Sequence, residues 1–114
     1  MRRAAAVDEN QAEVVEAFRK AGASVLHLHQ VGQGCPDVLV GVGNIDQQVE
    51  IKDGRKPPSQ RRLTTAEAKH HRGWRGRPVA IVECPEDAVA LVARMRWPFN
   101  SEGNEYIMDR KGMP

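Results

Sequence analysis

The spacing of apolar and polar residues predicts an ordered region that begins near Asp8 and ends at Arg96. Apolar residues recur at helical spacing in the first and last parts of this region. Between them lie short apolar or alternating runs, bounded by Gly, Pro, Asn and Asp, which are typical of strands. We expect helices over 8–21, from 64 onward and over 85–96, and strands over 24–29, 37–42, 47–52 and 78–82.

Local signals place the helix ends. Asp8 is suited to cap the first helix, with Gln11 three residues later completing a capping-box pattern, and Gly22 is suited to end it. Thr64 or Thr65 caps the second helix, with Glu67 in its first turn, and Trp74 is expected to close the core beneath that helix. The order of the elements is helix, strand, hairpin, helix, strand, helix. It predicts an α/β fold (α-β-β-β-α-β-α) with a mixed sheet of about four strands flanked by helices.

The two central strands form a predicted hairpin around the turn residues Gly43 to Asp46. A four-residue loop there sets Val42 opposite Gln47, and therefore Asp37 opposite Lys52. Strict alternation puts Glu50 and Lys52 on one face of the second strand. Asp37, Glu50 and Lys52 are then expected on the same face, at the same end of the hairpin.

This group has two interpretations. On a solvated face, Asp37 and Lys52 would form a surface ion pair that contributes little. Alternatively, the carboxylates of Asp37 and Glu50 and the carbonyl of Ile51 hold Mg²⁺ or Mn²⁺, and Lys52 assists an attacking water. Pro36 at the start of the strand, and the glycines just before it, favour the second interpretation.

Pro36-Asp37 followed by Glu50-Ile51-Lys52 resembles the motif of the PD-(D/E)XK nucleases. Gly32 to Asp37, Glu50 to Gly54, and Leu63-Thr64 opening a helix are similar to the VRR-NUC branch (virus-type replication-repair nuclease), above all its small phage and prophage members. The resemblance covers roughly residues 8–93.

The resemblance implies a restriction-endonuclease-like core and hydrolysis of DNA phosphodiester bonds to 5′-phosphate and 3′-hydroxyl ends. It also implies selectivity for branched DNA, as in Holliday-junction resolvases, and a homodimer with paired sites. Relatives place an acid or amide from the first helix near the metal, a position that Asp8 or Gln11 would take here. Where relatives have Gln this chain has Glu67, so Glu67 is expected to cap its helix, and contact with substrate is left open.

Charge is distributed unevenly along the chain. The formal net charge is +2, yet nine Lys or Arg against two acids give the segment 52–77 a net +7. Such a block is typical of a protein that binds a phosphate backbone, and a solvated surface is the other interpretation. Aromatic residues make up only 4% of the chain, which makes base stacking a weak candidate. The residues expected to bind nucleic acid are Gln33, Arg55, Lys56, Arg61, Arg62 and Lys69.

The remaining composition sets the class of protein. The 114 residues allow one domain, predicted at 1–96, with an irregular tail at 97–114. No apolar run is long enough to span a membrane, and two cysteines without metal-ligand spacing fit a reducing cytoplasm. The sequence thus predicts a metal-dependent DNA endonuclease. A catalytically silent nucleic-acid-binding module, and a nuclease for RNA or for a specific duplex sequence, remain as alternatives.

Overall fold

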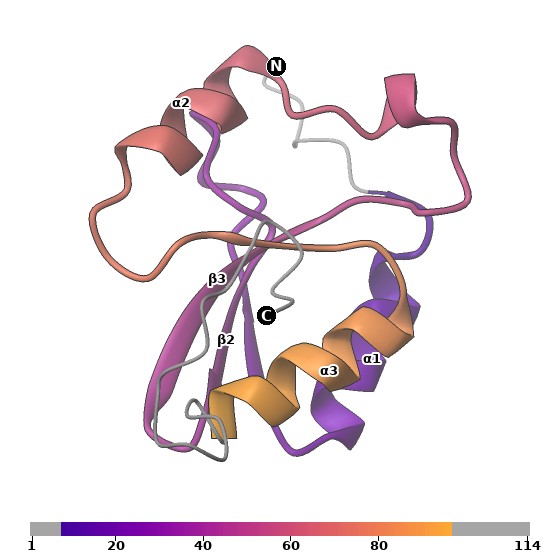
Figure 1. Cartoon of the computed structure of the whole chain (residues 1–114), viewed down its shortest axis with the longest axis vertical. Helices are drawn as coiled ribbons and strands as arrows, with labels where there is room; N and C mark the ends of the chain where they lie inside the picture. Colours follow the sequence, from indigo (N-terminus) through magenta and orange to yellow (C-terminus); the bar gives the residue numbers. More distant parts are fainter. Residues whose placement is uncertain (1–7, 97–114) are drawn as a thin grey trace, which may run out of the picture.

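A computed structural model describes residues 8–96 of the chain as seven helices and strands with one short 3₁₀ turn (Figure 1). Their order matches the predicted α-β-β-β-α-β-α, and the predicted tail at 97–114 lies outside the described residues. The elements are α1 (Gln11–Lys20), β1 (Ser24–His27), β2 (Val38–Val42), β3 (Ile45–Ile51), the 3₁₀ turn η1 (Pro58–Gln60), α2 (Thr65–Gly73), β4 (Ala80–Val82) and α3 (Pro85–Arg96).

The four strands form one sheet in the order β1-β2-β3-β4. β1 pairs with β2 and β2 with β3 in antiparallel fashion, whereas β3 and β4 are parallel. The parallel pair requires a long crossover, and the chain between β3 and β4 supplies it with η1 and α2. The mixed four-stranded sheet expected from the sequence is therefore confirmed.

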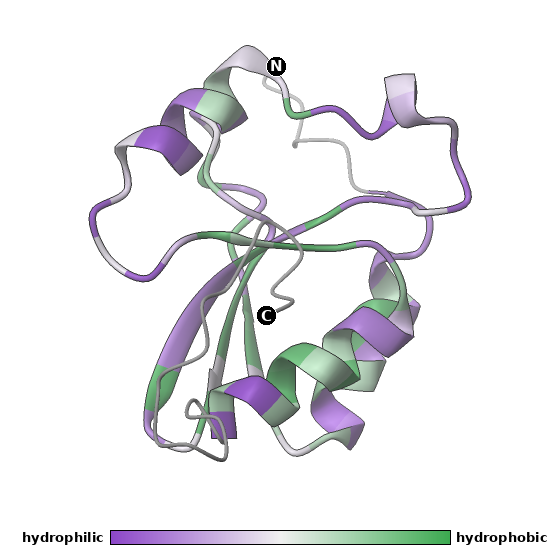
Figure 2. Cartoon of the chain, in the orientation of Figure 1, coloured by the Kyte–Doolittle hydropathy of each residue, from purple (hydrophilic) through white to green (hydrophobic). Residues whose placement is uncertain are grey.

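The hydrophobic core lies between the sheet and the helices α1 and α3, which run side by side (Figure 1). Figure 2 shows apolar residues along the strands and on these two helices. The apolar stripe of α3 is buried as expected, as is that of α1 except for the partly buried Ala21. The residues from these two stripes that lie in the core are Val14, Val15, Phe18, Ala88, Leu91, Val92 and Met95.

The helix α2 is held differently, because none of its residues is buried. It lies away from the α1–α3 pair, and its second half is strongly hydrophilic (Figure 2). Trp74, at its C-terminal end, was expected to close the core, but 46% of it is exposed. That expectation is wrong because α2 docks on the sheet through polar side chains rather than through an apolar face.

The first helix starts later than expected. Asn10, not Asp8, is the N-cap residue of α1, and Asp8 contributes only its carbonyl, which accepts the amide of Gln11 at 3.0 Å. The predicted capping box of Asp8 and Gln11 is therefore wrong. The C-terminal end agrees with the expectation. Gly22 has φ +98° and, with Ala23, closes a Schellman motif onto the carbonyls of Arg19 and Phe18.

Within residues 8–96, no helix combines the length and apolar character that a membrane crossing requires.

Candidate functional site

The β2–β3 hairpin closes through a two-residue turn. Gly43 and Asn44 have φ values of +60° and +63°, as the two central residues of a type I′ turn require, and Val42 pairs with Ile45. The expected four-residue loop is therefore wrong, and the register differs by two residues. Because side chains alternate with period two, a two-residue shift leaves each on its predicted face. The shift places Asp37, next to the Val38–Val49 pair, opposite Glu50 rather than Lys52.

At the open end of the hairpin, the partly buried carboxyl group of Asp37 meets the buried carboxyl group of Glu50. Oδ2 of Asp37 accepts the amide of Ile51 at 2.7 Å, which fixes its side chain across the two strands. Glu50 is only 2% exposed. Burial, followed by the neighbouring carboxylates of Asp37 and Glu67, raises the pKa of Glu50 to about 10. Burial also raises the pKa of Asp37. Neither group resembles a solvated surface acid.

Lys52 completes the group and is bound by an acid from α2. Its Nζ donates to Oε1 of Glu67 at 3.0 Å, and both side chains are largely buried. Burial disfavours the ammonium, but the hydrogen bond and charge of Glu67, with smaller contributions from Glu50 and Asp8, raise the pKa of Lys52. The lysine therefore stays protonated beside the two carboxyl groups.

Glu67 caps its helix, as the sequence predicts, and its side chain also reaches the site. The side chain of Thr64 accepts the amide of Glu67 at 3.1 Å, and Oε1 of Glu67 accepts the amide of Thr64 at 2.8 Å. This is the predicted capping box of the second helix. The same Oε1 atom receives the ammonium of Lys52, so the residue that starts α2 also reaches the site.

His71 also reaches the site, a role that the sequence did not assign to it. Its Nε2 lies 3.6 Å from Oε1 of Glu50, and its side chain is largely buried. Glu67 and His71 are four residues apart and so share one face of α2, which lies over the carboxyl groups. A His four residues after the capping Glu was the only signal in the sequence that could have identified it.

The loop before β2 positions α2 over the sheet. Gly34 has φ +79°, and a Cβ there would lie 2.2 Å from the carbonyl oxygen of Ala66 in the first turn of α2. Only glycine permits this close approach of backbone to backbone. Gln33, expected to bind nucleic acid, is exposed in the same loop with φ +58°. The loop therefore presents Gln33 beside the helix that covers the site.

The carboxyl pair fits a divalent cation. Oε1 of Glu50 is buried and forms no hydrogen bond within residues 8–96, and burial keeps Glu50 protonated. A bound cation would satisfy this oxygen and favour the ionised acid. No group of three or more His, Cys, Asp or Glu in the described part of the chain is arranged to hold a metal. A cation here would thus rely on two carboxylates, a backbone carbonyl such as that of Ile51, and water.

Asn10 is a second residue that sequence reasoning missed. Its Nδ2 donates to the carbonyls of Lys52 and Glu83 at 3.2 and 3.1 Å, and its side chain does not cap α1. It therefore ties the start of α1 to the end of β3. The preference of N-cap positions for Asn could have found it. Of the two candidates named instead, Gln11 is buried and Asp8 pairs with Lys56 at 3.6 Å.

The predicted nucleic-acid-binding cations fall into two groups. Three are held by acids: Arg55 by both carboxylate oxygens of Asp53, Lys56 by Asp8, and Arg61 by Glu83 at 3.0 Å. The two hydrogen bonds from the Arg55 side chain and one from its amide lower the pKa of Asp53 to about 2. The other two, Arg62 and Lys69, are exposed and form no ion pair with any described residue.

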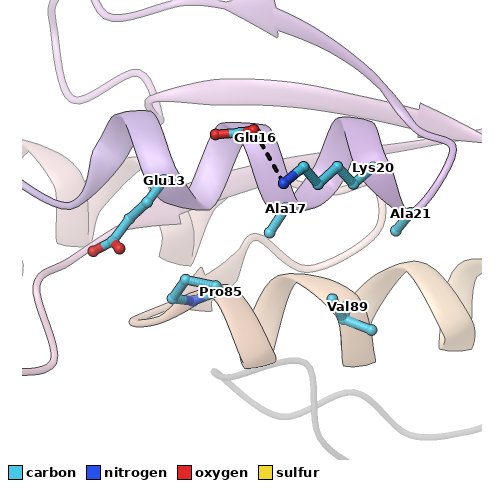
Figure 3. Close-up of a pocket in the computed structure, with 7 residues that line it drawn as sticks. All are labelled: Glu13, Glu16, Ala17, Lys20, Ala21, Pro85 and Val89. Atoms are coloured by element: carbon cyan, nitrogen blue, oxygen red, sulfur yellow. Dashed lines mark ion pairs between the residues drawn. The ribbon is translucent and has the colours of Figure 1, made fainter.

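Two hollows lie away from the carboxyl pair. One, of about 670 Å³, is lined by Arg55 and Arg61 together with a larger number of acids, among them Asp53 and Glu83, so its lining is acidic on balance. The other, of about 540 Å³, lies between α1 and α3. Figure 3 shows the Glu16–Lys20 ion pair on the α1 side of this second hollow. It contains none of the predicted catalytic residues.

Comparison with protein-family models, with curated proteins and with solved structures finds no match for this chain.

Proposed function

We propose that the chain is a divalent-metal-dependent DNA endonuclease with a PD-(D/E)XK type of core. One observation carries this proposal. The partly buried Asp37 and the buried Glu50 meet the protonated Lys52 at one end of the sheet. Removing two acids and a lysine from water without fully balancing their charges costs folding free energy in a small protein. Such arrangements cluster at functional sites.

Each side chain has a defined task in this proposal. Asp37 and Glu50, with the carbonyl of Ile51, would hold Mg²⁺ or Mn²⁺. The cation would supply Lewis-acid activation of water and of the phosphodiester. Lys52 stabilises negative charge on the phosphoryl oxygens, and Glu67 holds its ammonium in place and charged. Since α2 covers the carboxyl pair, it limits the access of bulk water to the reacting phosphate.

Junction selectivity and paired action on two strands belong to the same proposal. One domain of this size has one such site, and a symmetric pair of copies would supply two.

Cleavage assays test the proposal. We expect the protein to cut labelled DNA with Mg²⁺ or Mn²⁺ and not with EDTA, and Lys52→Ala and Asp37→Asn to lower the rate by about 100-fold or more. Lys20→Ala, an exposed lysine of α1, is the matched control and should leave the rate unchanged. The cleavage rates of a four-way junction, a linear duplex, a flap and RNA then show which substrate is preferred. Equal loss of rate in Lys20→Ala would contradict the assignment of the site.

One observation favours a catalytically silent binding module. The ammonium of Lys52 is already engaged by Glu67, so the charges of this pair balance without substrate. Binding of DNA that is independent of divalent ions, with no cleavage of any substrate, would establish this alternative.

A further inference from the structure

The C-terminal end of α2 presents an exposed aromatic stack. The rings of His70 and Trp74 lie with centroids 5.4 Å apart and planes at 24°. Four large hydrophobic residues are well exposed within 8–96, and Trp74 is the only aromatic one. The half-exposed indole therefore presents a large apolar face against which another planar ring can stack.

The stack is anchored to the sheet. Nε2 of His70 forms a hydrogen bond with Oε1 of Gln48 in β3 at 2.7 Å, and the amide of Trp74 donates to the carbonyl of His70. Gly76 lies close to the indole, because a Cβ at that position would come within 2.8 Å of Nε1 of Trp74. The indole is thus ordered before any ligand binds, which lowers the entropic cost of stacking against it.

The stack is adjacent to the carboxyl site. Gln48 and Glu50 lie on one face of β3, about 7 Å apart at two residues of strand rise. His71, which follows His70 in α2, lies 3.6 Å from Glu50. A flexible strand whose phosphate lies at the carboxyl pair could therefore place a neighbouring base over Trp74.

The charges around the stack suit the backbone of such a strand. Lys69, Arg72 and Arg75 are exposed on either side of Trp74, and none forms an ion pair with a described residue. In the preceding loop, by contrast, Arg55, Lys56 and Arg61 are held by acids, and only Arg62 forms no ion pair with a described residue. Aromatic faces alternating with unpaired cations are the recurring means of binding single-stranded nucleic acid.

We propose that the His70–Trp74 stack is a platform for an unpaired base next to the phosphate that is cut. This inference rests on the proposed nuclease function. It favours, over a fully paired four-way junction, DNA with an unpaired stretch at the cleavage position, such as a flap, a frayed end or a single strand. Fully paired duplex keeps its bases stacked on one another and gains nothing from the platform.

A binding assay in EDTA tests the platform without any cleavage. With Trp97→Phe, Trp74 is the only tryptophan of the chain. We expect its emission to be quenched by a 12-nucleotide oligo(dT) strand, and much less by a duplex of the same length. In the chain with Trp97 intact, Trp74→Ala should weaken binding of a labelled oligo(dT) strand about 5- to 100-fold by anisotropy. It should change duplex binding less than about threefold, and Trp74→Phe should keep most of the single-strand affinity.

Val89→Ala, an exposed apolar residue of α3, is the control and should leave both affinities unchanged. Emission of Trp74 that stays constant at saturating oligo(dT), or equal losses for single strand and duplex in a folded Trp74→Ala, would overturn the platform. The two proposals can be tested separately. Quenching of Trp74 emission without any metal-dependent cleavage would support the platform and overturn the nuclease function. Metal-dependent cleavage, with no quenching and no loss of single-strand affinity in Trp74→Ala, would support the nuclease function and overturn the platform.

Discussion

Ionising the buried carboxyl group of Glu50 in the folded protein costs electrostatic free energy that its neighbours do not offset. Its carboxyl is buried beside Asp37 and Glu67, and its pKa is raised to about 10. The unfolded chain ionises Glu50 above its ordinary value of 4.5, while the folded chain keeps the proton. The stability that Glu50 contributes is therefore fully present below about pH 4.5 and is lost as the pH rises toward 10.

Glu50→Gln should remove this loss, because the amide matches the protonated acid in shape and does not ionise. A tenfold difference in proton affinity between the folded and unfolded chain corresponds to about 1.4 kcal/mol. We therefore expect the variant to be more stable than the native protein by about 1–3 kcal/mol at pH 8.5, and by less at pH 5.5. Urea unfolding in EDTA at the two pH values measures the difference.

Glu16→Gln, which changes an exposed acid of α1, serves as the comparison and should have a small effect at both pH values. The electrostatic interpretation of Glu50 fails if Glu50→Gln is the less stable protein at pH 8.5. The same substitution should abolish metal-dependent cleavage, so stability and activity are expected to move in opposite directions.

At the level of elements, α2 depends on a few specific contacts instead of an apolar face. Gly34 is the most demanding of them, because its φ is +79° and the backbone of Ala66 occupies the place of a side chain. Gly34→Ala should destabilise the protein by about 1–3 kcal/mol and lower cleavage, since α2 carries Glu67 and His71. Thermal unfolding and the cleavage rate together measure this.

Gly73, the last residue of α2, provides the matched glycine, because a Cβ there meets nothing within 4 Å. Gly73→Ala should be neutral or slightly stabilising, since alanine favours helix. Similar losses in both variants would show that the close approach at Gly34 is not what holds α2.

The elements also show which parts of the structure the sequence could predict. Helical periodicity identified the apolar stripes of α1 and α3, and the spacing of Thr64 and Glu67 identified the capping box of α2. Both kinds of feature depend on residues only a few positions apart. The predicted hairpin register was wrong by two residues, but each side chain was assigned to the correct face of the sheet. This is because side chains alternate with period two, so a shift of two residues leaves each on the same face. Asn10 was missed because its contact, to the carbonyl of Lys52, depends on tertiary packing. Trp74 was misjudged because it stacks on His70 of its own helix, which docks on the sheet through polar side chains.

At the scale of the whole molecule, the basic segment does not act as one surface. Ion pairs neutralise Arg55, Lys56 and Arg61, and the unpaired cations gather around α2. The logarithm of the DNA-binding constant should therefore fall linearly with the logarithm of the salt concentration. Each phosphate contact adds about −0.9 to this slope on duplex and about −0.7 on a single strand. We expect a slope that corresponds to a few contacts rather than to nine.

The double variant Lys69→Ala, Arg72→Ala should reduce the magnitude of this slope on single-stranded DNA by about 1.4, while Arg19→Ala on α1 should leave it unchanged. Affinities measured by anisotropy between 50 and 200 mM NaCl give the slopes. An unchanged slope in the double variant would locate the phosphate contacts elsewhere on the molecule.

Because Oε1 of Glu67 accepts two hydrogen bonds, the backbone amide of Thr64 should report on changes at the candidate site. That amide and the ammonium of Lys52 both donate to Oε1 of Glu67, so whatever draws the lysine away strengthens or tilts the remaining bond. Thr64 is itself exposed and takes no part in the proposed chemistry. Its amide resonance in a nitrogen-15 spectrum would register the arrival of a cation or a phosphate, with no label or substitution placed in the site itself.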